Sequence, residues 1–244
     1  MSENPVLKMR PFRVTEIVWE TAEIFSLEIE PQDPADMIEF QAGQWVYLHL
    51  LEKDGTPWAR AAYSIASAPE ESSKRLKLGI KLEGDFTKRA SKLMPDDAVS
   101  IQGPFGVFVT PSGDEPLVMF AAGIGITPLR SMIRQLAKSK EQRAVTLFYS
   151  NKTIEDAAYF EDLDALAERA DWFTSVCTLT RGAPSDWPGE TGRIDGAMLD
   201  RHVSSLKNAV FFMCGPKAFM DGIRRMLEER GIDTRKRLKQ ELFG

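Results

Sequence analysis

The feature that most constrains this chain is a change of hydrophobic rhythm near residues 111–116. Before it, apolar runs are short, rich in β-branched residues and partly alternate with polar residues, as in 24–29. After it, apolar runs such as 117–122 are continuous, like strands buried on both faces, and helical patterns separate them. Short strands divided by turn residues favour a closed antiparallel barrel, whereas alternation of strand and helix favours a doubly wound parallel sheet. The sequence therefore predicts two domains, an all-β domain over 1–112 and an α/β domain over 113–244.

Charge and cysteine content argue against several classes of protein. The 31 basic and 36 acidic residues give a net charge of −5, which argues against a chain that coats nucleic acid phosphates. Cys177 and Cys214 are the two cysteines, and they cannot by themselves form a four-cysteine iron–sulfur or zinc site. We expect reduced thiols rather than a disulfide, and no metal site.

Two further sequence features bear on location. No stretch approaches the roughly 18 to 20 uninterrupted apolar residues that a membrane span requires. Residues 1–5 lack the basic and then apolar order of a signal peptide. We therefore expect a cytoplasmic protein with no membrane span and no nucleic acid partner.

The sequence Gly123-Ile124-Gly125-Ile126-Thr127-Pro128 directly follows a predicted buried strand and opens a helix. Glycine permits a tight turn and a close approach of the backbone to a pyrophosphate, while the helix N-terminus supplies unpaired N–H groups. Pro128 suits the first helical position, where its missing N–H costs nothing. The third glycine of the usual dinucleotide-binding motif is absent, so a plain strand–helix turn is the alternative.

A second motif, Cys214-Gly215-Pro216, also ends a predicted parallel strand and opens a helix. Ligands of open α/β sheets bind at the carboxyl ends of the strands, near the point where the strand order reverses. The motif is therefore a candidate part of a nucleotide site. Its alternative interpretation is a buried thiol that precedes a turn.

Two motifs in the all-β half contain residues suited to an aromatic, phosphorylated ligand. Tyr63 offers a ring for stacking, Ser64 a hydroxyl for hydrogen bonding, and Arg60 a cation for a phosphate. Gly84-Asp85-Phe86-Thr87 leads into a helix predicted over 87–94 and suits a second anion-binding helix start. The alternatives are that Tyr63 is an ordinary strand residue and that Thr87 is an N-cap.

In this order and spacing, the motifs resemble those of the ferredoxin–NADP⁺ reductase superfamily of flavoproteins, and the resemblance covers essentially the whole chain. It implies a six-stranded antiparallel barrel that binds FAD, followed by a Rossmann-like domain that binds NADP or NAD. Gly103-Pro104-Phe105-Gly106 resembles the motif that closes the family's barrel. The cofactor-binding residues implied by the resemblance are Arg60, Tyr63, Ser64, Lys81, Asp85, Phe86, Thr87, Gly123, Gly125, Ile126, Thr127, Pro128, Asn151, Arg181, Cys214, Gly215, Pro216 and Phe243.

The chain departs from the family pattern at one position. The family arginine stands two residues before the tyrosine, where this chain has Ala61, and Arg60 lies one residue earlier. A shift of one residue in a strand turns a side chain to the opposite face. Either a β-bulge returns Arg60 to the phosphate, or Lys81 or another cation takes over its role.

The resemblance implies a flavoprotein reductase of the ferredoxin–NADP⁺ reductase type. Such an enzyme moves a hydride from NAD(P)H to FAD and then passes electrons to an iron–sulfur or flavodoxin-type acceptor. The implied catalytic residues are Cys214, Thr127 and Tyr63, with Cys214 acting by its placement beside the nicotinamide rather than as a nucleophile. Phe243 resembles the terminal aromatic residue that covers the flavin in some relatives. The alternatives are an NADH-dependent reductase component of an oxygenase system and a catalytically silent FAD- and nucleotide-binding module.

Charge patterning bears on the partner and on the coenzyme. Residues 217–239 hold eight basic and four acidic side chains, which suits an acidic ferredoxin or flavodoxin, although a solvated helix surface has the same composition. Arg181 lies where relatives hold the 2′-phosphate of NADP, and residues 151–152 could assist it. Glu155 and Asp156 would repel a phosphate, so the sequence favours NADP over NAD only slightly.

Overall fold

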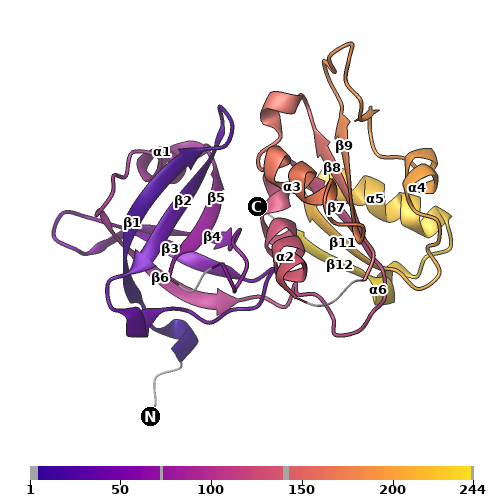
Figure 1. Cartoon of the computed structure of the whole chain (residues 1–244). Coiled ribbons are helices and arrows are strands. Elements are labelled where there is room, and N and C mark those ends of the chain that lie inside the picture. The colour runs from indigo at the N-terminus through magenta and orange to yellow at the C-terminus, as the bar shows by residue number, and fades with distance from the viewer. Residues whose placement is uncertain (1–4, 72–73, 140–142, 243–244) are drawn as a thin grey trace. The chain divides into compact units, whose positions relative to one another are not determined.

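The computed structural model describes residues 5–71, 74–139 and 143–242. The chain divides into two compact units (Figure 1). The first comprises Met1–Thr110 with Arg130–Lys138, and the second comprises Pro111–Leu129 with Ser139–Gly244. Residues 130–138 are thus grouped with the all-β half of the chain.

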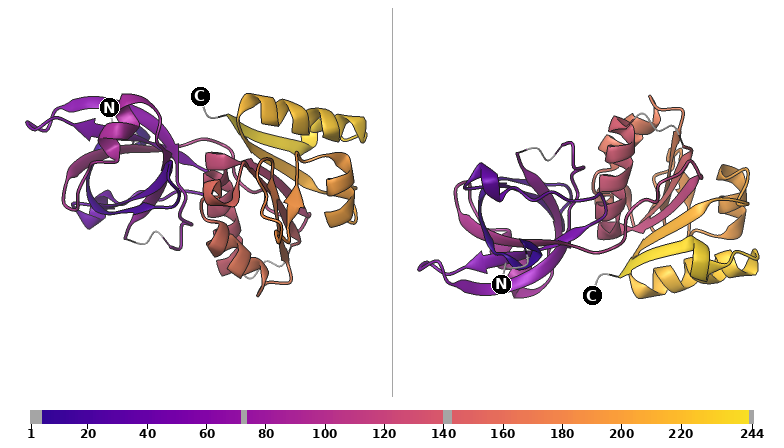
Figure 2. Two further views of the ribbon diagram at one scale, coloured as in Figure 1. Left: turned by 90° about the horizontal axis from the view of Figure 1, so that it is seen from above. Right: turned by 90° about the horizontal axis from the view of Figure 1, so that it is seen from below.

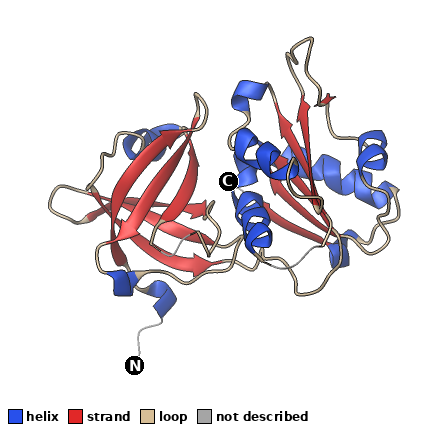
Figure 3. Cartoon of the chain, in the orientation of Figure 1, coloured by secondary structure: helices blue, strands red, loops and turns tan. Residues whose placement is uncertain are grey.

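The first unit contains a six-stranded antiparallel sheet, which confirms the fold class predicted for this half (Figure 3). The outer strands β4 and β5 meet just beyond the end of β4, where an isolated antiparallel bridge joins Ile65 to Leu78. Beside it, the Ala66 N–H donates to the Lys77 carbonyl over 2.8 Å, so the sheet curls until its two edges touch (Figure 2). In their order of pairing, the strands are β4 (Pro57–Ser64), β3 (Trp45–Leu51), β6 (Ala98–Phe105), β1 (Arg10–Trp19), β2 (Ile24–Pro31) and β5 (Leu76–Lys81).

The inside of this sheet is a hydrophobic core filled by the chain's own side chains. Burial of one large aliphatic or aromatic side chain contributes roughly 1.5 to 3 kcal/mol, so the sheet has a strong reason to curl around them. A ligand of this unit therefore cannot enter this core and has to bind residues that keep some exposed surface. Core members with no exposed surface include Phe12, Phe25, Leu27, Ile29, Val46, Leu48, Ile65, Leu78 and Ile101.

Helix α1 (Gly84–Ala90) lies between β5 and β6, three residues earlier than the helix predicted over 87–94. Its N-cap residue is Glu83, so the alternative that Thr87 is the N-cap is wrong. The Thr87 hydroxyl instead accepts a hydrogen bond from the Glu83 N–H over 2.6 Å and holds the first turn from inside the helix. Two short 3-10 turns, η1 (Pro5–Leu7) and η2 (Pro34–Asp36), complete this unit.

The second unit contains a six-stranded parallel sheet with helices on its faces, which confirms the predicted doubly wound fold (Figure 1). The chain pairs outward from β7 and then returns to the other side of β7, so the strand order reverses between β7 and β11. In their order of pairing, the strands are β10 (Glu190–Thr191), β9 (Phe173–Leu179), β8 (Val145–Asn151), β7 (Leu117–Ala122), β11 (Val210–Gly215) and β12 (Leu238–Leu242).

The helices of this part of the chain differ in detail from the predicted ones. The predicted acidic helix over 155–169 is divided into a 3-10 turn and a shorter helix, whereas the predicted helix over 216–230 matches α5 closely. The structure has η3 (Gly123–Gly125), α2 (Ile126–Lys138), η4 (Ile154–Asp156), α3 (Phe160–Ala167), α4 (Gly196–His202), α5 (Lys217–Glu229) and α6 (Thr234–Arg237).

Alternation along β8 shows how the helices cover the sheet. Phe148 belongs to a buried cluster with Met198 of α4 and Ile223 of α5. Tyr149 points to the other face, where its hydroxyl donates to the Ala158 carbonyl before α3 over 3.1 Å. Helices α4 and α5 therefore lie on one face of the sheet, and α3 lies on the opposite face (Figure 2).

Within the described residues, every helix is too short or too polar to cross a membrane. In the same part of the chain, no group of three or more histidine, cysteine or acidic side chains is placed to hold a metal ion.

Candidate functional site

The two glycine motifs of the second unit meet where the strand order reverses. Strand β7 runs into Gly123–Gly125, and its neighbour β11 ends at Gly215. A Cβ atom on Gly125 would lie 2.2 Å from the Cys214 carbonyl oxygen and 2.9 Å from the Gly215 nitrogen. Only glycine allows the two loops to come this close. The structure therefore brings together two motifs that the sequence predicted separately.

Gly123 is needed for a different reason. Its φ of +51° lies in the left-handed region that favours glycine. A Cβ atom built on Gly123 would meet no other atom within 4 Å, so the space beside this residue is open. In the first motif, Gly125 thus makes a contact that leaves no room for a side chain, and Gly123 offers backbone that a ligand can approach.

The start of α2 differs from the prediction. The 3-10 turn Gly123–Gly125 leads directly into the helix at Ile126, so Pro128 is the third helical residue rather than the first. Proline is tolerated there because N–H groups of the first helical turn have no partner within the helix. Thr127 is buried, and its hydroxyl donates to the Ile124 carbonyl over 3.0 Å. The helix start thus holds the Thr127 side chain in a fixed position.

Cys214 lies at the end of β11 with no exposed surface. Burial raises the pKa of its thiol well above the usual value of 9.0. The thiol is therefore protonated at neutral pH and is a poor nucleophile. Gly215 is buried next to it, and Pro216 follows as the exposed N-cap residue of α5.

Backbone hydrogen bonds tie together the segments that follow β8 and β9. The Asn151 carbonyl accepts from the Thr180 N–H over 2.9 Å and from the Thr180 hydroxyl over 3.0 Å. The Lys152 carbonyl accepts from the Arg181 N–H over 2.8 Å, and both of these basic side chains are exposed. Asn151 itself is buried, and its backbone carbonyl makes the contact with the segment that follows β9.

Two acidic residues, Glu155 and Asp156, follow Lys152 closely in the sequence and lie in η4. Hydrogen bonding from Thr153 holds the pKa of the exposed Glu155 carboxyl below its usual range. The Asp156 carboxylate accepts from the Thr153 N–H over 3.2 Å. Both expected sources of repulsion for a phosphate are therefore present beside Lys152.

The pairing of β3 with β4 shows which face each residue of the tyrosine motif occupies. Tyr63 pairs with Val46, a core residue, so its side chain lies on the inner face of the sheet. Burial raises the pKa of its hydroxyl far above the usual value. Ser64 is 2% exposed at the end of the strand.

Arg60 lies on the opposite face of the sheet from Tyr63. The pairing is continuous from Trp45–Ser64 to Leu50–Ala59, so the hypothesis that a β-bulge returns Arg60 to the side of the tyrosine is wrong. The Arg60 guanidinium instead lies 4.3 Å from the centre of the Tyr47 ring.

The basic and aromatic residues at the start of α1 are already in contact with other groups. The Lys81 ammonium lies 2.7 Å from the Glu83 carboxylate and 3.9 Å from that of Glu23. Asp85 is exposed in the first turn of the helix. Phe86 is half-buried, and its ring is stacked on the Tyr63 ring with centres 6.0 Å apart. The structure thus joins the tyrosine motif to the helix start.

One aromatic residue in this region was missed by the sequence analysis. Trp58, at the start of β4, stacks on Phe86 with ring centres 6.2 Å apart. No motif marks this position, and its only signal is an aromatic residue five positions before Tyr63. Phe243, the expected covering residue, lies outside the described residues.

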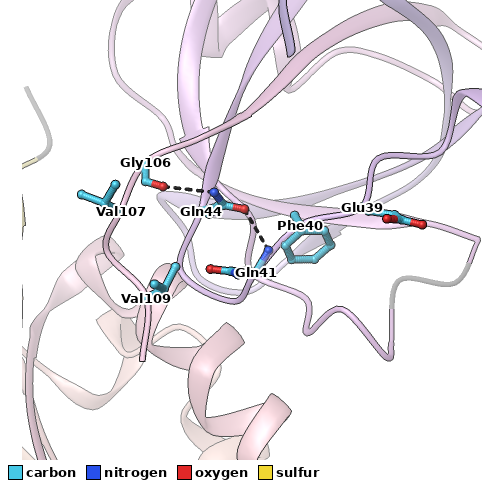
Figure 4. A pocket seen from close by; sticks show the side chains of 7 residues that line it. All are labelled: Glu39, Phe40, Gln41, Gln44, Gly106, Val107 and Val109. Atoms are coloured by element: carbon cyan, nitrogen blue, oxygen red, sulfur yellow. Dashed lines mark hydrogen bonds between the residues drawn. The ribbon is translucent and has the colours of Figure 1, made fainter. Parts of the chain in front are cut away.

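A hollow of about 520 Å³ opens in the first unit, beside the segment that follows β6 (Figure 4). The Gln44 amide donates to the Gly106 carbonyl over 3.0 Å at its wall, and Phe40 and Val107 contribute apolar surface. None of the predicted site residues lines this hollow.

Two known family models match this chain, one in each half. The model of the oxidoreductase FAD-binding domain matches residues 11–109, and that of the oxidoreductase NAD-binding domain matches residues 119–225. The chain therefore contains an FAD-binding domain followed by an NAD-binding domain. Together the two matched regions span most of its length.

Two relatives that are longer than this chain match it over most of its length. A flavohemoprotein of Deinococcus radiodurans is 28% identical over 243 residues, which cover 96% of this chain and 59% of that protein. One component of the Na⁺-translocating NADH-quinone reductase of Neisseria meningitidis is 30% identical over 216 residues, 82% of this chain and 52% of that one. The chain thus spans a little over half the length of these relatives.

A solved structure shows the same fold over nearly the whole chain. The flavohem-like FAD/NAD binding domain of nitric oxide dioxygenase from Vibrio cholerae superposes with a TM-score of 0.86. The match covers 96% of this chain and 98% of that one at 22% identity.

Proposed function

Since this chain belongs to the ferredoxin–NADP⁺ reductase superfamily of FAD- and NAD(P)-binding oxidoreductases, we propose that it takes electrons from NAD(P)H and delivers them to a separate electron-transfer protein. The observation that carries the proposal is the approach of Gly125 to Cys214 and Gly215. It exposes backbone rather than bulky side chains at the carboxyl ends of β7 and β11, where ligands of such sheets bind. Two motifs that could each be an ordinary turn thereby form one site.

The residues of the second unit fit a nicotinamide dinucleotide. The open space beside Gly123 and the first N–H groups of α2 suit a pyrophosphate. Lys152 and Arg181 are exposed on adjoining backbone and suit the additional phosphate of NADP. We therefore propose NADP as the preferred coenzyme. The negative charge of Glu155 would weaken the binding of its additional phosphate.

The residues of the first unit fit FAD at the ring and at the helix start. Tyr63 supplies an aromatic surface, and the buried Ser64 lies next to it. The N-cap residue Glu83 makes no side-chain cap, so the first N–H groups of α1 are left for other acceptors. We assign the phosphate contact of the family arginine to Lys81, because it ends β5 just before the start of α1, whereas Arg60 lies over the Tyr47 ring.

Bound FAD supplies the capacity to accept a hydride from the nicotinamide and to pass its electrons on. The contribution of the chain is to hold the reacting groups in position and to keep water away. Cys214 suits this role because its buried, protonated thiol adds no charge to the site. Thr127 suits it because its hydroxyl is fixed by the Ile124 carbonyl.

We propose an acidic ferredoxin or flavodoxin as the acceptor, bound by the basic segment 217–239. Ion pairs reduce the positive charge of this segment, because Lys217 lies 2.6 Å from Asp221 and Arg230 lies 2.8 Å from Asp200. Arg225 and Arg235 are exposed and retain the positive surface. Docking to an acidic partner would then be electrostatic and sensitive to salt.

A second candidate is an NADH-dependent reductase component of an oxygenase system. The observation in its favour is that one relative is named as part of an NADH-quinone reductase and that this chain spans about half of its length. A third candidate is a catalytically silent FAD- and nucleotide-binding module. The observation in its favour is that Arg60 lies on the face of the sheet opposite Tyr63.

The visible absorption spectrum of the purified protein tests these candidates. We expect a flavin band that bleaches on addition of NADPH, and less rapidly with NADH. Rapid bleaching followed by reduction of a ferredoxin supports the first candidate, whereas a preference for NADH supports the second. A colourless protein that cannot be reconstituted with FAD would refute the reductase.

A further inference from the structure

We propose that Trp58 is a positioning residue that fixes the ring of Tyr63 for the flavin. The inference rests on the proposed function, because it takes Tyr63 as the stacking surface. It concerns four side chains that lie in succession, here named the Trp58 stack: Arg89, Trp58, Phe86 and Tyr63.

The contacts within the Trp58 stack are continuous. The Arg89 guanidinium carbon lies 4.5 Å from the centre of the Trp58 ring. The Trp58 and Phe86 rings are nearly parallel, with an angle of 15° and centres 6.2 Å apart. The Phe86 and Tyr63 rings make an angle of 29° with centres 6.0 Å apart. Phe86 is therefore in contact with both strand aromatics, which restricts its ring and that of Tyr63.

The backbone explains how Trp58 reaches Phe86. Residues of even number in β4, such as Arg60, lie on the face opposite Tyr63, and regular alternation would place Trp58 with them. The pairing shifts at this point, because Leu50 pairs with Ala59 and Leu51 with Pro57. Trp58 is the extra residue of this β-bulge, and a bulge redirects the side chain that it carries.

The far end of the stack is anchored to the turn between β3 and β4. Arg89 donates to the Leu51 carbonyl over 2.8 Å and lies 3.1 Å from the Glu52 carboxylate. These contacts fix the guanidinium over the Trp58 ring, where a cation is attracted to the aromatic face. The stack thus links the β3–β4 turn, through α1, to the tyrosine motif.

Exposure argues that Trp58 does more than fill the core. Trp58 remains 40% exposed, and it is absent from the buried cluster inside the sheet. An exposed tryptophan contributes less burial than an internal one, so its contacts with the Phe86 ring and the Arg89 guanidinium are its main interactions. Trp58 thus acts directly on Phe86, and through Phe86 on Tyr63, the residue that we propose to stack on the flavin.

Binding of FAD to the full-length apoprotein tests the proposal. We expect Trp58→Ala to weaken FAD binding about three- to tenfold, since an aromatic pair contributes roughly 0.5 to 1.5 kcal/mol. We also expect it to change the visible circular dichroism of the bound flavin, which reports the orientation of the ring. Trp58→Phe should restore most of both signals because it keeps an aromatic stack.

Trp19 provides a matched control. It is 49% exposed in β1 of the same sheet and contacts Phe25 at a ring distance of 5.3 Å, outside the Trp58 stack. Trp19→Ala should therefore leave the affinity for FAD and the flavin spectrum unchanged. Thermal unfolding of each variant checks that the fold is intact.

The possible failures are distinct. If the wild-type chain binds FAD and Trp58→Ala matches it in affinity and dichroism, the positioning role is wrong while the reductase proposal stands. Equal losses in Trp58→Ala and Trp19→Ala would also overturn the role, because they would indicate general destabilisation. If the wild-type chain binds no FAD, the proposed function fails and this inference fails with it.

Discussion

Replacement of Gly125 by alanine should separate the two nucleotide motifs. The new Cβ atom would lie 2.2 Å from the Cys214 carbonyl oxygen and 2.6 Å from its carbon, and both are backbone atoms. Ordinary contact begins at 3.4 Å, so the loops must move apart by about 3.4 − 2.2 = 1.2 Å. Overpacking of this kind costs roughly 1 to 3 kcal/mol.

The displacement should affect hydride transfer more than stability. A misplacement of about 1 Å in a site of this kind can cost a hundredfold in rate. We therefore expect Gly125→Ala to slow the bleaching of the flavin by NADPH about a hundredfold in stopped-flow absorption. The FAD content should be unchanged, because Gly125 lies outside the FAD-binding domain.

Gly222 supplies the control for this experiment. It lies in α5, and a Cβ atom there would meet nothing within 4 Å. Gly222→Ala should keep the wild-type rate and raise the free energy of unfolding by up to about 1 kcal/mol, because alanine is the better helix former. A Gly125→Ala variant with both the wild-type rate and the wild-type stability would show that the close approach of the two loops has no such role.

Three further outcomes are expected. Replacing Lys152 and Arg181 together by alanine should raise KM for NADPH at least tenfold and leave KM for NADH nearly unchanged, and steady-state assays with both coenzymes check this. Burial raises the pKa of Cys177 from 9.0 to about 11. As the pH rises, the thiol therefore ionises in the unfolded chain before it does so in the folded one. The free energy of unfolding should then fall between pH 9 and 11 by up to about 1.4 kcal/mol per pH unit. Denaturant titrations at several pH values should show a shallower fall of this free energy in Cys177→Ala. A fall of the same slope in the variant and the wild type would contradict the raised pKa of Cys177. Reduction of a ferredoxin should slow severalfold between low and 0.5 M salt and more gently in Arg225→Gln; a rate independent of salt would argue against the basic segment as the docking surface.

The order of the elements followed from local sequence patterns. Alternation in the first half and continuous apolar runs in the second fixed the type of each sheet, because period and burial are written into neighbouring residues. Helix boundaries depend on contacts at the helix ends that the hydrophobic pattern does not contain. The hydroxyl of Thr87 bonds back to Glu83, and the turn at Gly123 runs into α2, so both helices begin earlier than expected.

The sequence by itself determined which motifs the chain contains, their order along it, and the departure of Arg60 from the family pattern. Only the tertiary structure decided the role of that departure, because the face of a strand residue depends on where the pairing shifts. The shift lies at Trp58 and not between Arg60 and Tyr63. Likewise, the contact between Gly125 and Cys214 joins segments about 90 residues apart, and it exists only because parallel pairing places β7 beside β11.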